Sequence, residues 1–150
     1  MKFSRTETLD ILKAWLAISV AFAIVLSQGL SNFLFSFLLS AVTVGVGFLL
    51  HELGHKFVAQ KYGYVAEFRS FDLMLVLAIA MSFFGFVFAA PGAVMYHGAY
   101  NKVKTGKIAA MGPIVNILLA FLFLLIPGVI GQYGFRINSW LALFNLIPVA

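Results

Sequence analysis

A short run of ionisable residues, His51-Glu52-Leu53-Gly54-His55, is the part of the chain best suited to chemistry. In a helix, residues four apart differ by about 40° around the axis, so His51 and His55 project from one face. Two imidazoles on one face can hold one metal ion, at Zn–N distances of about 2.0–2.1 Å. Glu52 then lies beside the pair, where it can take a proton from a metal-bound water without being a ligand. The spacing therefore predicts a metal centre with a general base.

The alternative is a chance match on a soluble surface helix, because this five-residue pattern alone is modest evidence. Here the pattern continues an apolar run from Asn32 to Leu50. An ionisable residue inside a membrane helix costs about 2.5–3.5 kcal/mol, so three of them in five residues need a compensating role. We therefore expect one zinc ion per chain, bound by His51 and His55.

The third metal ligand is harder to find. A catalytic zinc takes three protein ligands and leaves one position open. The internal candidates are Glu67, Asp72 and His97, since Glu7 and Asp10 begin the first helix. None of the candidates has a spacing that compels assignment. A surface ion pair for Glu67 and an exposed loop position for His97 are the better interpretations. The third ligand is expected beyond residue 150.

Composition indicates a membrane protein. Apolar residues make up 63% of the 150 residues and charged residues 10%, whereas a soluble domain has about 25% charged residues. The chain has no Cys, which excludes disulfides, a thiolate nucleophile and Cys-based zinc sites. Its ten Lys and Arg lie in short clusters between apolar runs, a distribution typical of membrane topology. We expect a lipid bilayer around the chain and no nucleic-acid partner.

The apolar runs predict an all-α polytopic membrane protein with four to five transmembrane or re-entrant segments and a small membrane-associated β element. Ser4 and Glu7 match a capping box before the first segment. A cleaved signal peptide is the competing interpretation of that segment, but no clear small-residue cleavage site ends it. We expect one integral membrane domain over residues 1–150, incomplete at its C-terminal end. The expected segments are Ile11–Leu30, Asn32–Tyr62, Leu73–Ala90, Ile108–Ile126, and a last one that begins near Asn138.

Charge sets the expected orientation in the cell membrane. Lys56, Lys61 and Arg69 follow the apolar run Asn32–Leu50, and the connection before that run has no charge, so the metal site is expected toward the cytoplasm. The lysines at 102, 104 and 107 should then be cytoplasmic too. This favours a re-entrant excursion over a full crossing for Leu73–Ala90. The composition of Phe86–Tyr96 is strand-like around a Pro-Gly turn, and such a strand offers an edge to an extended peptide.

Three ordered motifs resemble the intramembrane zinc metalloproteases of the site-2 protease family. That family carries H-E-x-x-H late in one membrane helix, then Gly-Pro-x-x-Asn, then Asn-x-x-Pro followed shortly by Leu-Asp-Gly. The resemblance covers about residue 42 to the end. The chain departs from the family in ending about where Leu-Asp-Gly should start, and the Asp of that motif is the family's third zinc ligand. The matching residues here are His51 to His55, Gly112-Pro113-Ile114-Val115-Asn116, and Asn145-Leu146-Ile147-Pro148.

The resemblance implies a role for each matching residue. His51 and His55 would bind zinc, Glu52 would be the general base, and Asn145 would help to position the scissile peptide or its oxyanion. Phe86–Tyr96 would correspond to the family's membrane-associated strand. Residue types alone leave simpler interpretations open: an ordinary helix start at Gly112-Pro113, a hydrogen bond from Asn116 to a neighbouring helix, and a structural kink at Pro148.

The function expected from these features is a zinc endopeptidase that cleaves a transmembrane or membrane-adjacent segment of a substrate protein. A second enzyme class, the prenyl-protein-type membrane proteases, needs a later Glu ligand, and no Glu follows Glu67. A different class is a catalytically silent membrane module that binds substrate helices because the third ligand is absent. Zinc content distinguishes an intact site from such a module.

Overall fold

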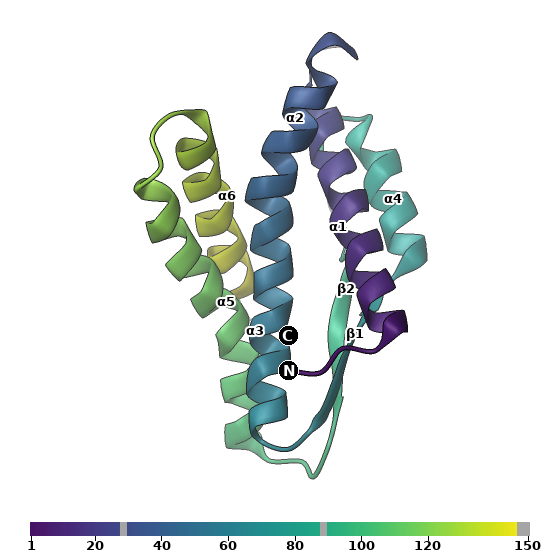
Figure 1. Ribbon diagram of the computed structural model, residues 1–150, viewed down its shortest axis with the longest axis vertical. Coiled ribbons are helices and arrows are strands. Elements are labelled where there is room, and N and C mark those ends of the chain that lie inside the picture. Colours follow the sequence, from purple (N-terminus) through teal and green to yellow (C-terminus); the bar gives the residue numbers. More distant parts are fainter. Residues whose placement is uncertain (28–29, 88–89, 147–150) are drawn as a thin grey trace.

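The computed structural model describes residues 1–27, 30–87 and 90–146, and most of these residues are helical. α2, η2 and α3 form one continuous central rod, Phe33–Lys61. The rod has two neighbouring helices on one side, α5 and α6, and two on the other, α1 and α4 (Figure 1). A two-stranded antiparallel sheet lies beside the lower half of α1. The elements are α1 (Arg5–Leu26), η1 (Leu30–Asn32), α2 (Phe33–Ser40), the π-helical turn η2 (Ala41–Gly45), α3 (Val46–Lys61), β1 (Val65–Ser70), α4 (Asp72–Ser82), β2 (Gly92–His97), α5 (Lys102–Leu124) and α6 (Val129–Leu146).

Among the described residues, three helices are long and apolar enough to cross a membrane: α1, the rod Phe33–Lys61, and α5. Together with the small sheet they confirm the predicted fold class. α4 has 11 residues, so it extends only about 17 Å at 1.5 Å per residue and cannot span a hydrocarbon core of about 30 Å. Which side of a membrane each loop occupies stays a prediction.

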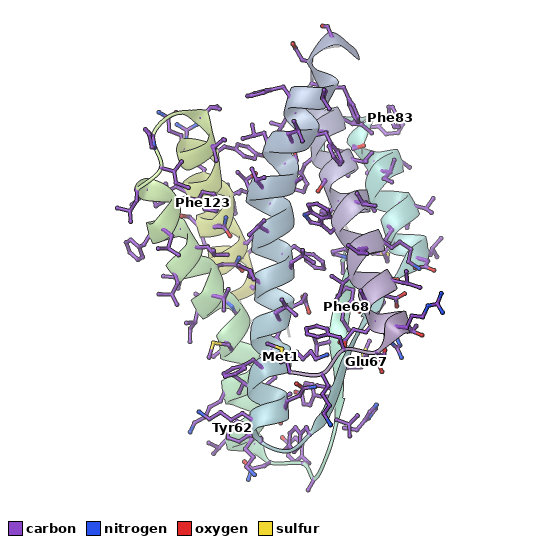
Figure 2. All side chains as sticks on the ribbon, in the orientation of Figure 1. Met1, Tyr62, Glu67, Phe68, Phe83 and Phe123 are labelled. Carbon is purple, nitrogen blue, oxygen red and sulfur yellow. The ribbon has the colours of Figure 1, made fainter. Side chains whose placement is uncertain are left out.

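The segment between the strands leaves the sheet and returns to the same end of it. Ser70 pairs with Gly92 in the sheet, and the amide of Phe71 donates to the carbonyl oxygen of Pro91 at 3.0 Å. Phe83, 71% exposed just after α4, lies far from Tyr62 at the opposite end of the molecule (Figure 2). The two ends of the excursion are thus joined at one end of the sheet, and whether the segment re-enters or crosses a membrane stays a prediction.

The strand predicted over Phe86–Tyr96 begins later than expected. β2 starts at Gly92 and continues to His97, while residues 88 and 89 lie outside the described residues. Pro91 explains the late start, because it has no amide hydrogen to contribute to a ladder. The partner strand β1 was not predicted; it pairs with β2 from Val65 opposite His97 to Ser70 opposite Gly92.

Two helix boundaries also differ from expectation. α6 begins at Val129 and not near Asn138, which is fully buried in mid-helix; Gly128 takes the positive φ of +85° that turns the chain into it. Pro113 lies inside α5 and not at a helix start. That helix starts at Asn101, whose side chain accepts from the amide of Lys104 at 3.0 Å.

Of the two hydrogen bonds of the predicted capping box at the start of α1, the structure contains the one from the Glu7 amide to Ser4. The hydroxyl of Ser4 accepts from the amide of Glu7 at 3.0 Å. The Glu7 carboxylate does not reach back to Ser4; its Oε2 accepts from the amide of Phe68 at 2.6 Å. Three residues on, Asp10 Oδ2 accepts from the amide of Ser70 at 3.1 Å. Side chains of α1 therefore take the place of a third strand along the outer edge of β1.

Candidate metal centre

The two histidines of α3 lie one turn apart and face the same way. Their ring centroids are 4.7 Å apart with the planes at 84°, and the two Nε2 atoms are 3.0 Å apart. His51 is 8% exposed. The helix spacing alone brings the rings to one face, as predicted, and packing of α5 against α3 decides which nitrogens point outward.

The protonated nitrogen of each ring can be deduced from its neighbours. The carbonyl oxygen of Ile108 lies 2.7 Å from His55 Nδ1 and can only accept, so that Nδ1 carries the hydrogen. Asn116 Oδ1 lies 2.6 Å from His51 Nδ1. The amide nitrogen of Asn116 donates to the Gly47 carbonyl at 3.1 Å and to Asn138 Oδ1 at 3.0 Å, which leaves its oxygen to accept from His51. Both rings therefore carry the hydrogen on Nδ1.

When both rings are neutral, the two Nε2 lone pairs consequently face each other across 3.0 Å. A cation removes that repulsion. Two imidazoles on one tetrahedral zinc, with Zn–N of about 2.05 Å, have nitrogens about 3.3 Å apart, close to the separation found. Hydrogen bonds from Nδ1 to a carbonyl or an amide oxygen are also what orients histidine ligands in zinc sites. The residues present thus fit a metal ion.

Gly112 on α5 keeps the space in front of the two imidazole rings open, because it has no side chain. A Cβ at this position would lie 2.5 Å from Nε2 of both His51 and His55. Any larger residue would occupy the place that an ion needs. The Gly-Pro pair of the sequence motif therefore contributes open space here and does not mark a helix start.

Glu52 and the two histidines are the group of potential ligands that the described residues bring together, with ligand atoms within 4.8 Å of one another. Glu52 Oε2 also accepts from the amide of Val94 in β2 at 3.2 Å. A cavity of about 670 Å³ opens in front of His51 and Glu52, and Asn145 of α6 lines it. His51, Glu52 and Asn145 therefore line one cavity, and His55 adjoins it through its contact with His51. Pro148, the last residue of the predicted Asn-x-x-Pro motif, lies outside the described residues.

The internal candidates for a third ligand lie elsewhere. Arg69 Nη1 pairs with Glu67 Oε1 at 2.9 Å, as the surface ion-pair interpretation predicted, and hydrogen bonds from Ser4 and Arg69 hold the pKa of Glu67 below its usual value. Lys13 pairs with Asp72 at 2.8 Å. His97 is exposed in β2. Within the described ranges none of the three joins the histidines, so a ligand beyond residue 150 stays a prediction.

Several residues of the centre were not found from the sequence. Asn138 was read only as the start of a helix, yet its oxygen supports Asn116 and its amide nitrogen donates to the Gly134 carbonyl at 2.9 Å. The carbonyl of Ile108 carries no side-chain signal. Asn116 does bond to a neighbouring helix, as the simpler interpretation held, but its oxygen accepts from a metal-site histidine.

Comparison with known proteins adds one relative. The chain is 39% identical over 160 aligned residues to a protein of Methanocaldococcus jannaschii named "putative zinc metalloprotease", and the match covers 99% of this chain and 81% of that protein. No family model and no solved structure matches the chain.

Proposed function

The chain belongs to the zinc metalloproteases, and on that premise we propose that it is an endopeptidase of the site-2 protease type, which cuts a membrane protein substrate in or beside its transmembrane segment. Zinc is its cofactor, with His51 and His55 as ligands. The observation that carries the proposal is the pair of Nε2 lone pairs converging beside Glu52, among helices apolar enough to cross a membrane.

Two side chains that line the cavity, Glu52 and Asn145, have a role in this reaction. Bound zinc supplies a Lewis acid that polarises the scissile carbonyl and activates water. Glu52 takes the proton of the attacking water and delivers it to the leaving amine. Asn145 lines the same cavity, and its amide nitrogen, which now donates to the Leu141 carbonyl at 2.7 Å, can turn toward the developing oxyanion.

The outer edge of β2 supports an extended substrate. Phe68 and Val94 face each other in the sheet, and the Phe68 amide points away to Glu7, so this is a pair without mutual hydrogen bonds. The Val94 amide therefore points outward too, toward Glu52. A substrate strand added along β2 would unwind the scissile segment beside the metal. It would also take the Val94 amide from Glu52 and leave that carboxylate free for water.

The cavity lies between elements that a substrate helix could approach. Its walls include Phe22 of α1 and Trp140 of α6, on opposite sides of the rod (Figure 1). Both walls are apolar, which suits entry from the bilayer. We propose a multi-pass location in the cell membrane with the site toward the cytoplasm, supported by Lys61 at the end of α3 and Arg69 in β1.

Glu52→Gln tests the proposal with the protein in vesicles and a substrate carrying one transmembrane segment. Zinc content should stay at one per chain, and cleavage should fall by about 10²–10⁴-fold, the usual contribution of a general base. Glu67→Gln, on a half-buried carboxylate away from the centre, is the matched control and should cleave normally. Full activity of Glu52→Gln would eliminate the assignment.

The silent-module alternative has one observation in its favour. In residues 1–27, 30–87 and 90–146, Glu52 is the single carboxylate within reach of the histidines, and it is already assigned as base. A wild-type protein that captures substrate helices yet contains no zinc would support the module. Zinc that is lost on His55→Ala would support the enzyme.

A further inference from the structure

A fully buried ion pair lies next to the metal helix and has no task in the reaction described above. Lys56, the residue after the ligand His55, pairs with Glu7 of α1, and both side chains are 0% exposed. Lys56 Nζ also donates to the carbonyl of Lys2 and lies 3.9 Å from the centroid of the Phe3 ring. The N-terminal segment thus covers the pair from solvent.

Stability alone does not account for such a pair. Removing two charges from water costs several kcal/mol per ion, and replacing a buried ion pair by apolar residues of similar volume is often neutral or stabilising by about 1–4 kcal/mol. What an ion pair adds is direction, because its hydrogen bonds hold their partners at one distance and angle. Apolar packing, such as Phe68 against Phe48 with ring centroids 5.9 Å apart, holds elements together with less directional control.

The pair belongs to a closed ring of contacts that begins and ends on α3. Lys56 bonds to Glu7, and the second oxygen of Glu7 accepts from the Phe68 amide at 2.6 Å. Phe68 of β1 lies opposite Val94 of β2. The Val94 amide then donates to Glu52 at 3.2 Å, and Glu52 is one helical turn before Lys56. α3 therefore reaches both edges of the sheet: Glu52 bonds directly to β2, and Lys56 reaches β1 through Glu7 of α1.

We propose that Glu7, anchored by Lys56, is a positioning residue that holds the outer edge of β2 at a fixed distance from the metal centre. The inference rests on the proposed function for its catalytic consequence. The histidines are oriented from the other side, by Asn116 and by the Ile108 carbonyl of α5. Zinc binding therefore does not depend on the closed ring of contacts through Lys56 and Glu7. The position of β2 does depend on it.

The double variant Glu7→Leu/Lys56→Met separates positioning from stability, because it replaces the pair by apolar side chains of similar size. Expected results are a modestly lower melting temperature, because the buried Phe68 amide loses its acceptor, an unchanged zinc affinity, and a kcat about 10²-fold lower. A misplacement of about 1 Å in a reacting geometry costs this much. KM should change less, since β2 still offers its edge.

Spin labels measure the position of β2 directly. The chain has no Cys, so labels at Met95→Cys of β2 and Phe57→Cys of α3, both exposed, report one distance. In the otherwise native protein this distance should have a narrow distribution, and in the double variant the distribution should widen at least twofold. The matched control removes the exposed pair on the other face of α1, with Lys13→Met/Asp72→Leu, and should leave the width unchanged.

An unchanged width and kcat in the double variant would overturn the proposal, and so would loss of zinc in that variant. Should the double variant not fold, Glu7→Gln gives the second measurement: it keeps the shape but weakens the anchor, and should widen the distribution by a smaller amount. The distance between the two spin labels can be measured whether or not the protein cleaves a substrate. A wild-type protein that cleaves nothing would refute the protease while the width still tests the ring.

Discussion

Gly112→Ala is the substitution that tests the metal centre most sharply. The added Cβ would lie 2.5 Å from Nε2 of His51 and equally close to Nε2 of His55. The rings cannot simply turn away, because each Nδ1 is already hydrogen-bonded, one to Asn116 and the other to the Ile108 carbonyl. The methyl group must push α5 away from α3, or the histidines must give up those hydrogen bonds.

The size of the effect follows from the distances. Cβ atoms essentially never approach a nitrogen to under 3.0 Å, so at least about 0.5 Å of movement is needed, more than twice the ±0.2 Å that zinc–ligand distances tolerate. Losing the support of a ligating histidine typically costs 10–100-fold in metal affinity. We expect at least that loss for Gly112→Ala, which corresponds to about 1.4–2.8 kcal/mol of binding free energy.

Zinc affinity is measured by competition with a chelator, and the fold by circular dichroism and thermal unfolding. Gly106→Ala is the matched control on the same helix, since a Cβ there meets nothing within 4 Å. It should bind zinc as wild type does and be more stable by about 0.5–1 kcal/mol, as expected for Gly to Ala in an exposed helix. If Gly112→Ala bound zinc as tightly as Gly106→Ala, the geometry of the centre would be refuted.

Three further results are expected. Glu7→Leu alone should lower the free energy of unfolding by about 3–5 kcal/mol, since it leaves the Lys56 charge buried and unpaired; chemical denaturation measures this, and a loss under 1 kcal/mol would contradict it. His97→Ala should leave zinc stoichiometry at the wild-type value by elemental analysis, because the side chain is exposed in β2. Gly45→Ala should shift the fluorescence of Trp15, because a Cβ would lie 2.5 Å from its Nε1; an unchanged spectrum would argue against that contact.

The sequence was sufficient for features that depend on local spacing. Histidines four residues apart on a helix must share a face, and the Ser4 cap and the apolar runs are equally local, so each was predicted correctly. The surface ion pair of Glu67 followed from its neighbour Arg69.

Features that depend on packing between distant elements could not be read in this way. β1 has the polar residues Glu67 and Arg69 on one face, so it resembles a loop until β2 pairs with it. Asn138 looks like a helix start because its partner Asn116 is brought to it only once α5 and α6 pack together. No local pattern distinguishes a buried Lys56 from a solvated one.

The carboxylates of α1 have a consequence for how the sheet can grow. Glu7 and Asp10 occupy the outward amides of Phe68 and Ser70, so the ladder is terminated on that side by the chain's own helix. A side chain accepts a hydrogen bond but offers no backbone to continue a ladder. A second copy of the protein therefore cannot add a strand at Phe68 and Ser70 of β1. Of the two strands that the structure describes, β2 is the one whose outer edge an extended peptide could join, beside Glu52.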